Sequence, residues 1–121
     1  MVPLVLVVDD DNEIAAFLDE AIQEVGYRVV TAVDGKALPI ARDEQPAVIL
    51  LDIHMPGMDG IEVSRRLRAD PVTAHIPIVL MSTIERIRAL SGEMAINDQL
   101  PKPFTLDRLY STLERWAPIE T

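Results

Sequence analysis

The sequence contains no cysteine and only two histidines. The absence of cysteine excludes a disulfide scaffold, a thiolate nucleophile and a cysteine-ligated zinc site. Basic residues are also scarce, with 11 of them against 20 acidic residues and a formal net charge of −9. Direct nucleic-acid binding needs a basic surface that neutralises phosphates, so we expect no nucleic-acid partner. The acidic excess is compatible with the binding of divalent cations.

Long apolar runs are missing as well. The N-terminal stretch MVPLVLVVDDD has no basic region, and its apolar part is too short for a signal peptide or a membrane span. We therefore expect a cytoplasmic protein without membrane association. A chain of 121 residues has the size of one ordinary domain, so residues 1–121 are expected to form a single domain.

The most informative stretch is AVILLDIHMPGMDG at 47–60. Its apolar run at 48–51 is typical of a parallel strand buried on both faces, and the run stops at Asp52. A second apolar run at 4–8 stops in the same way at Asp9, Asp10 and Asp11. Because ligands bind at the carboxyl ends of the strands in open α/β sheets, these carboxylates are predicted to share a site.

The remaining apolar spacing predicts an alternation of five strands and five helices. Further strands are expected at 28–32, at 78–81 and around Leu100, and helices at about 12–25, 36–44, 61–68, 84–94 and 106–116, with Phe17 on the apolar face of the first helix. Such alternation implies right-handed crossovers. The predicted fold class is therefore α/β, a doubly wound parallel sheet flanked by helices.

On this interpretation four strand ends deliver Asp9, Asp10, Asp52, Ser82 and Lys102 to one edge of the sheet. Crowded carboxylates repel one another unless a cation is present, and oxygen ligands favour Mg²⁺, with Mn²⁺ as a substitute. A lysine and a hydroxyl beside them suit the binding of a phosphoryl group, and a carboxylate can accept such a group covalently. Asp52 is the candidate nucleophile.

Four motifs carry a resemblance to a known family. They are VVDDD at 7–11, LLDIHMPGMDG at 50–60, PIVLMST at 77–83 and LPKPF at 100–104. In this order they resemble a response-regulator receiver domain of two-component signalling, similar to the chemotaxis regulators. The resemblance covers essentially the whole chain and implies a flavodoxin-like sheet of strand order 2-1-3-4-5.

The resemblance implies that Asp52 accepts a phosphoryl group from a sensor histidine kinase or a phosphotransfer protein. It implies direct Mg²⁺ binding by Asp10, Asp52 and the backbone carbonyl of His54, with Asp9 acting through water. In such domains the lysine pairs with the phosphoryl oxygens.

The same resemblance implies that Ser82 moves to bond a phosphoryl oxygen and that Lys102 precedes a cis peptide bond. The surface of the fourth helix, fifth strand and fifth helix would then contact a downstream protein target. The protein itself is expected to be a monomer or a phosphorylation-dependent dimer. Catalysis would be limited to the domain's own phosphorylation and dephosphorylation, so we do not expect a conventional enzyme.

Some positions depart from the family's pattern. Gln99 stands where an aromatic residue usually rotates with the switch hydroxyl, and Thr83 adds a second hydroxyl beside Ser82. The segment between Thr83 and Lys102 is somewhat short, which predicts an altered output face. The side chain of His54 and that of Ile84 are expected to tune the site from beside it.

Several functional-looking residues have simpler interpretations. Asp11 is expected to cap the first helix, and Asp59 with Gly60 to shape the turn into the third. His75 is expected to be inert. Trp116 and Tyr110 are expected to contact the core or a partner.

Other functions remain as alternatives. A receiver-like interaction module that signals without phosphorylation is favoured by Gln99 and disfavoured by the complete set of Asp, Ser and Lys residues. A phosphatase of the haloacid dehalogenase type would use Asp9 and Asp11 but leaves the motif at 50–60 unexplained. A flavin-binding protein would need a phosphate-binding loop after the first strand, which the sequence lacks.

Overall fold

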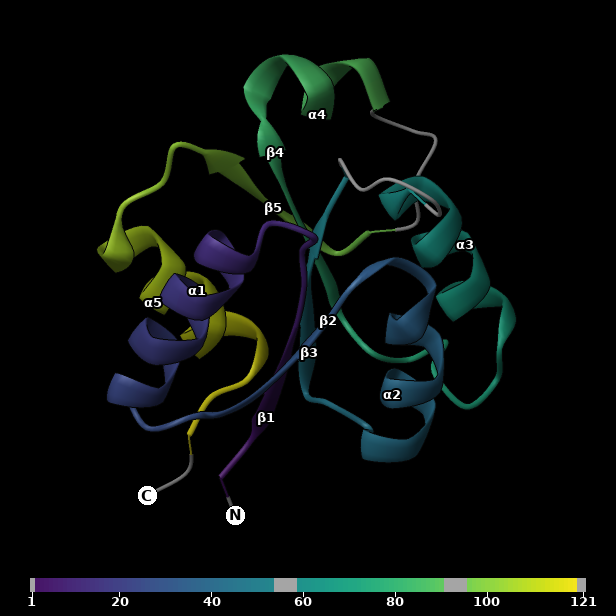
Figure 1. The fold of residues 1–121 in the computed structure, drawn as a ribbon, viewed down its shortest axis with the longest axis horizontal. Coiled ribbons are helices and arrows are strands. Elements are labelled where there is room, and N and C mark those ends of the chain that lie inside the picture. Colours follow the sequence, from purple (N-terminus) through teal and green to yellow (C-terminus); the bar gives the residue numbers. More distant parts are fainter. Residues whose placement is uncertain (1, 54–58, 91–95, 120–121) are drawn as a thin grey trace.

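The computed structural model describes residues 2–53, 59–90 and 96–119. Its strands are β1 (Leu4–Val8), β2 (Arg28–Ala32), β3 (Val48–Asp52), β4 (Ile78–Thr83) and β5 (Asp98–Lys102). Its helices are α1 (Asn12–Glu24), α2 (Ala37–Glu44), α3 (Gly60–Ala69), α4 (Ile84–Leu90) and α5 (Leu106–Trp116), with a 3₁₀ turn η1 (Asp34–Lys36) before α2. The strands form one parallel sheet in the order β2-β1-β3-β4-β5 (Figure 1), so the predicted fold class and strand order are confirmed.

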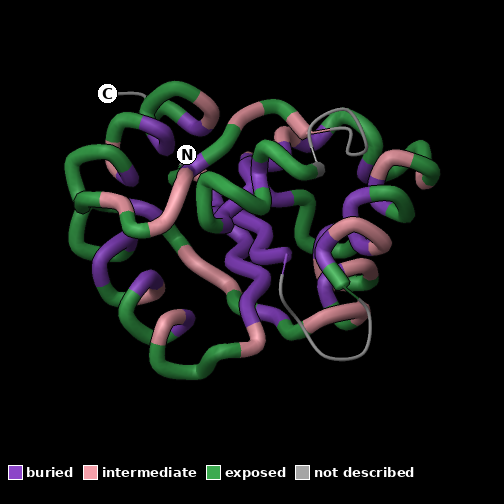
Figure 2. The backbone as a smooth tube through the Cα atoms, turned by 90° about the horizontal axis from the view of Figure 1, so that it is seen from above, coloured by how far each residue is buried: buried purple, intermediate pink, exposed green. Residues whose placement is uncertain are grey.

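The sheet separates two apolar layers because successive side chains of a strand point to opposite faces. In β1, Val5 and Val7 pack in the layer under α1 and α5, whereas Leu6 and Val8 pack in the layer under α2 and α3. A smaller cluster joins Ile87 of α4 to Leu80 of β4 on the second face. The strands are consequently the buried centre of the molecule, and the helices expose their outer sides (Figure 2).

Helix α1 begins and ends at the residues that the sequence favours. The side chain of Asp11 accepts hydrogen bonds from the backbone N–H groups of Glu13 (3.0 Å) and Ile14 (3.2 Å), which confirms the predicted N-cap. After the helix, Gly26 has a φ of +101°, a conformation that glycine adopts without strain. The prediction for Phe17 was wrong, because this residue is 56% exposed.

The end of β4 differs from the sequence-based expectation, whereas the predicted end of α4 lies outside the described residues. β4 continues through Ser82 and Thr83 because these residues pair in register with Pro101 and Lys102 of β5. The described part of α4 ends at Leu90, whereas the apolar spacing predicted a helix to about residue 94; residues 91–95 lie outside the described ranges.

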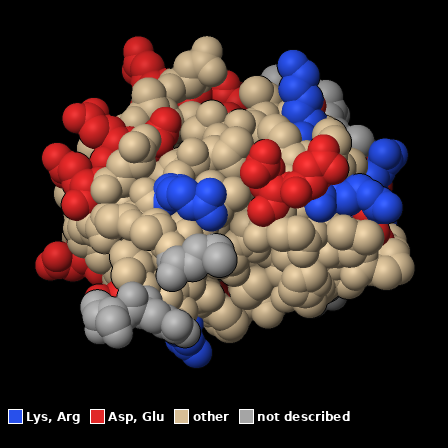
Figure 3. All heavy atoms as spheres, turned by 90° about the horizontal axis from the view of Figure 1, so that it is seen from below, with Lys and Arg blue, Asp and Glu red and all other residues tan. Residues whose placement is uncertain are grey.

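Acidic side chains are unevenly spread over the surface. Figure 3 views the molecule from below Figure 1, and acidic side chains gather on its left, the side on which Figure 1 places α1 and α5. Helix α1 itself contains acidic residues and no basic one. No helix in the described part of the chain is long and apolar enough to cross a membrane.

Candidate functional site

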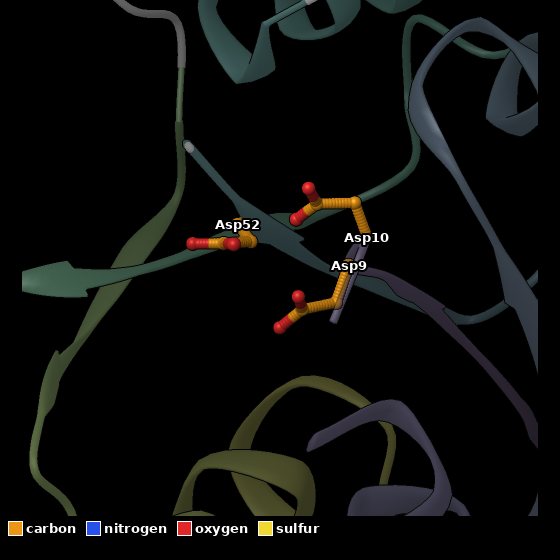
Figure 4. Close-up of side chains that lie close together, drawn as sticks. All are labelled: Asp9, Asp10 and Asp52. Atoms are coloured by element: carbon orange, nitrogen blue, oxygen red, sulfur yellow. The ribbon is translucent and has the colours of Figure 1, made fainter. Parts of the chain in front are cut away.

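Three carboxylates meet at the carboxyl edge of the sheet. Val8 of β1 pairs in register with Leu51 of β3, so the next residues, Asp9 and Asp52, leave neighbouring strands side by side. One carboxylate oxygen from each of Asp9, Asp10 and Asp52 lies within 4.8 Å of the others (Figure 4). The structure thus brings together the acidic residues that the sequence predicted to share a site.

Asp9 is the most enclosed of the three. Its side chain has no exposed surface, and its Oδ1 accepts a hydrogen bond of 2.9 Å from the backbone N–H of Asp11. Its other oxygen, Oδ2, has no hydrogen-bond partner among the described residues. A buried carboxylate oxygen without a hydrogen bond is costly, so this atom is a candidate ligand for a cation.

Burial raises the pKa of Asp9 from 3.8 to about 6. The backbone hydrogen bond from Asp11 opposes this shift, the charge of Asp52 adds to it, and the ammonium of Lys102 opposes it again. The negative charge of Asp10 makes a further, smaller contribution that raises the pKa. Asp9 therefore holds a proton more tightly than an exposed aspartate does.

Lys102 supplies the cation of the site from the end of β5. Its Nζ lies 3.5 Å from Oδ1 of Asp52 and 3.8 Å from Oδ2 of Asp9, and its side chain is 26% exposed. The distance to Asp9 is too long for a hydrogen bond, so that contact is purely electrostatic. The peptide bond from Lys102 to Pro103 is cis, as the resemblance implied.

The two hydroxyls at the end of β4 have different surroundings. Ser82 is 2% exposed, and its Oγ has no hydrogen-bond partner among the described residues. Thr83 is exposed, and its Oγ1 accepts a hydrogen bond of 3.3 Å from the backbone N–H of Arg86 at the start of α4. Ser82 is therefore the hydroxyl with a free bonding capacity, whereas Thr83 helps to begin a helix.

Gly60, which together with Asp59 was predicted to shape the turn into the third helix, also lies against the end of β3, a contact that sequence reasoning missed. Its N–H donates to the carbonyl of Ile53 at 3.1 Å, and a Cβ atom at this position would lie 2.5 Å from the backbone oxygen of Asp52. Only a residue without a side chain allows α3 to begin this close to the end of β3. Asp59 caps α3 by accepting a hydrogen bond of 2.9 Å from the N–H of Glu62, in agreement with its predicted role in that turn.

The other predicted positions lie at the margin of the site or beyond the described ranges. His54, the predicted carbonyl ligand and tuning residue, lies outside the described residues. Ile84 is the first residue of α4 and is 43% exposed. Gln99 is exposed on β5, one residue after the start of that strand.

The residues present fit a hard divalent cation. The three converging groups offer only oxygen atoms, and one of these, Oδ2 of Asp9, is buried without a hydrogen-bond partner among the described residues. Mg²⁺ binds to such oxygen ligands and commonly shares them with phosphate oxygens and water. The neighbouring ammonium of Lys102 and the hydroxyl of Ser82 add the groups that bind an anionic oxygen. The arrangement can accommodate a cation and a phosphoryl group together.

Comparisons with known proteins agree with this geometry. The family model described as "Response regulator receiver domain" matches residues 5–114. The chain is 43% identical over 104 residues to the response regulator PleD of Caulobacter vibrioides, covering 82% of this chain and 22% of that protein. It is 30% identical over 120 residues to sporulation initiation phosphotransferase F of Bacillus subtilis, covering 97% of this chain and 95% of that protein.

A solved structure of a receiver domain has the same fold. The receiver domain of the sensor histidine kinase PA1611 of Pseudomonas aeruginosa, crystallised with magnesium in its active-site cleft, superposes with a TM-score of 0.88. It is 28% identical, and the alignment covers 96% of this chain and 98% of that one. The chain thus spans nearly all of some relatives and less than a quarter of PleD.

Proposed function

Because the chain belongs to the family of response regulator receiver domains, we propose that residues 1–121 act as a single receiver domain that is phosphorylated on Asp52. The observation that carries this proposal is the meeting of Asp9, Asp10 and Asp52 beside the ammonium of Lys102, 3.5 Å from Asp52. Asp52 is the acceptor because it ends the central strand β3 and its Oδ1 lies beside the ammonium of Lys102.

The reaction moves a phosphoryl group from a nitrogen to an oxygen. A carboxylate oxygen of Asp52 forms a bond to phosphorus, while the bond from phosphorus to the imidazole nitrogen of a phosphohistidine breaks and the imidazole leaves with that electron pair. Lys102 pairs with a phosphoryl oxygen, and the hydroxyl of Ser82 donates a hydrogen bond to another. Water later hydrolyses the acyl phosphate, so the domain's chemistry is limited to its own phosphorylation and dephosphorylation.

A divalent cation would be held by Asp9, Asp10 and Asp52. When bound, Mg²⁺ supplies positive charge that neutralises the phosphoryl oxygens as the group is transferred. Asp9 would contribute its Oδ2 to this set, a buried oxygen that has no hydrogen-bond partner among the described residues. The carbonyl of His54 remains a proposed further ligand.

The donor of the phosphoryl group is proposed to be a sensor histidine kinase or a phosphotransfer protein. Phosphorylation is proposed to change the surface formed by α4, β5 and α5. Ser82 links the two events, because it is the second-last residue of β4 and only Thr83 separates it from the start of α4 at Ile84. Capture of a phosphoryl oxygen by this hydroxyl would pull on the first turn of α4 and alter its contacts with a downstream protein.

The proposal is tested with a small phosphodonor, which removes the need to know the kinase. The protein is incubated with acetyl phosphate with and without Mg²⁺, and its intact mass is followed together with the fluorescence of Trp116. We expect a gain of one phosphoryl mass that requires Mg²⁺ and is absent from Asp52→Asn. Asp59→Asn serves as the matched control, because it changes a nearby exposed aspartate that caps α3.

Two results would contradict the proposal. A folded protein that gains no mass with Mg²⁺ and acetyl phosphate would support the alternative of an interaction module that acts without phosphorylation. A gain of mass that persists in Asp52→Asn would place the acceptor elsewhere.

A further inference from the structure

A cavity of about 510 Å³ lies where the end of α1, the start of β2 and the end of α5 come together. Its described lining consists of Val25, Tyr27, Tyr110, Glu114, Pro118 and Ile119, and it is named here the tyrosine cavity. A volume of this size is in the range of small-molecule sites.

The tyrosine cavity is at the opposite edge of the sheet from the carboxylate cluster. Tyr27 immediately precedes β2, which runs parallel to β1, so the cavity lies at the amino ends of the strands. Asp9 and Asp52 lie at the carboxyl ends of β1 and β3. Figure 1 likewise shows both chain ends on the side of the sheet away from α4. The cavity is therefore separate from the proposed phosphorylation site.

One wall of the tyrosine cavity is aliphatic. Val25 and Ile119 are 38% and 36% exposed, so hydrocarbon faces water here. A Cβ atom on Gly26 would lie 3.2 Å from Cδ1 of Ile119, which shows that the segment after α5 packs against the end of α1. An apolar group placed against this wall would remove exposed hydrocarbon from water.

Two phenol rings form the inner part of the cavity. Tyr27 is only 6% exposed, and Tyr27 and Tyr110 both pack against the apolar layer under α1 and α5, which holds their rings in place. Neither hydroxyl makes a hydrogen bond with another residue of the described chain. A tyrosine as buried as Tyr27 usually has a partner for its hydroxyl, so this group has a bonding capacity left for a ligand.

The charge of the cavity is negative. Glu114 forms no ion pair with a described residue, and the described lining contains neither lysine nor arginine. Burial raises the pKa of Tyr27, and the negative charge of Glu114 raises it further, so the carboxylate lies close to the phenol. In a chain with a net charge of −9, these groups favour a cation over an anion.

We propose that the tyrosine cavity binds a small organic cation, in which an ammonium group is attached to an aromatic or branched aliphatic body. The ammonium pairs with the carboxylate of Glu114 and donates to the oxygen of a tyrosine hydroxyl, and the aromatic faces attract its charge. The body packs against Val25 and Ile119.

The lining disfavours other classes of ligand. An anion would be repelled by Glu114, and a bare divalent metal ion would find a single carboxylate among the described lining residues. A neutral apolar molecule would leave the carboxylate and the phenol hydroxyls without partners. This inference goes beyond the proposed function and does not depend on phosphorylation of Asp52.

The test uses three probes of similar shape and different charge, because the natural ligand is unidentified. They are 2-phenylethylammonium, the neutral 2-phenylethanol and the anionic 3-phenylpropionate, each titrated into the isotope-labelled full chain at pH 7 and followed by the amide signals in NMR spectra. A ligand of this size is expected to bind in the millimolar range, so the titration extends to about 50 mM.

We expect saturable shifts from 2-phenylethylammonium that centre on the amides of Tyr27, Tyr110 and Ile119. The ammonium probe should bind roughly threefold more tightly than the alcohol, which is the gain that an exposed charge pair supplies, and this advantage should shrink as salt is raised. The carboxylate probe should bind more weakly than the alcohol.

Variants assign the contacts. Glu114→Gln should weaken the ammonium probe by roughly threefold and leave the alcohol unchanged. Glu44→Gln is the matched control, because it makes the same change of net charge at an exposed position on α2. Tyr110→Leu should also weaken the ammonium probe by roughly threefold, whereas Tyr110→Phe keeps the ring face and should weaken it less. Circular dichroism checks that each variant is folded.

Several outcomes would overturn the inference. Shifts that do not saturate, equal affinity for the three probes, or an equal loss in Glu44→Gln and Glu114→Gln would show that no cation site exists here. A dimer that 2-phenylethylammonium dissociates in light scattering would assign the cavity to a second copy of the chain.

Discussion

The buried carboxylate of Asp9 should make the metal-free protein less stable at neutral pH than at mildly acidic pH. The folded-state pKa of Asp9, about 6, lies above the unfolded value of 3.8, so the folded protein binds this proton more tightly. The stabilising contribution is therefore fully present below pH 3.8 and is lost as the pH rises through about 6. At about 1.4 kcal/mol per pKa unit, the loss is at most about 3 kcal/mol.

Asp9→Asn isolates this effect because it keeps the shape of the side chain and the acceptor for the N–H of Asp11 while removing the charge. In EDTA, urea denaturation at pH 7.5 should give the variant a free energy of unfolding that is higher than wild type by about 1–3 kcal/mol. At pH 4 the difference should be much smaller. Asp43→Asn, on the exposed side of α2, should change stability by less than about 0.5 kcal/mol at either pH.

The reasoning would be refuted if Asp9→Asn were less stable than wild type at pH 7.5, or if the difference between them did not vary with pH. Addition of Mg²⁺ provides a second check. A bound cation favours the charged form of Asp9, so Mg²⁺ should stabilise the wild type more than the variant and reverse part of the difference.

Three further changes probe the surroundings of Asp52 and the last helix. Gly60→Ala should destabilise the protein by about 1–3 kcal/mol in urea, because its Cβ would meet immobile backbone of β3; an unchanged or higher stability would contradict the close approach. Lys102→Met should bind Mg²⁺ roughly tenfold more tightly in calorimetry, since a competing cation is removed; unchanged affinity would argue against the proximity of the ammonium to the carboxylates. Trp116→Phe should cost about 1 kcal/mol in thermal unfolding by removing the hydrogen bond to Asp98, whereas Tyr110→Phe serves as a comparison on the same helix.

The strands and the main site were predictable because both follow from local patterns. The apolar runs that end in Asp9 and Asp52 fix two strand ends, and parallel crossovers place those ends at one edge of the sheet. Lys102 follows the same logic from β5. The identity of the acidic cluster thus needed only strand boundaries and the rule that parallel strands share a carboxyl edge.

The features that could not be predicted depend on contacts between distant segments. Nothing near Gly60 in the sequence indicates that its Cα faces the carbonyl of Asp52. Likewise, the hydrogen bond between Trp116 and Asp98 joins α5 to the start of β5, and periodicity alone assigned the indole to an apolar stripe. Helical spacing also placed Phe17 on the apolar face of α1, but the residues of this helix that are buried are Ala15, Leu18, Ala21 and Ile22, and Phe17 remains exposed.

The position of β1 in the sheet bears on how the chain is assembled during synthesis. β1 is translated first, yet it has neighbours on both sides, β2 and β3. Its second partner is complete only when Asp52 has been made, so until then one edge of β1 lacks its neighbour, and three of the other four strands are incomplete or absent. β5, which carries Lys102, is the last of these five strands to be translated and pairs at the outside of the sheet, beside β4. The acidic residues of the site are therefore synthesised before its lysine, so until β5 has been made a nascent chain lacks the internal cation that offsets their repulsion.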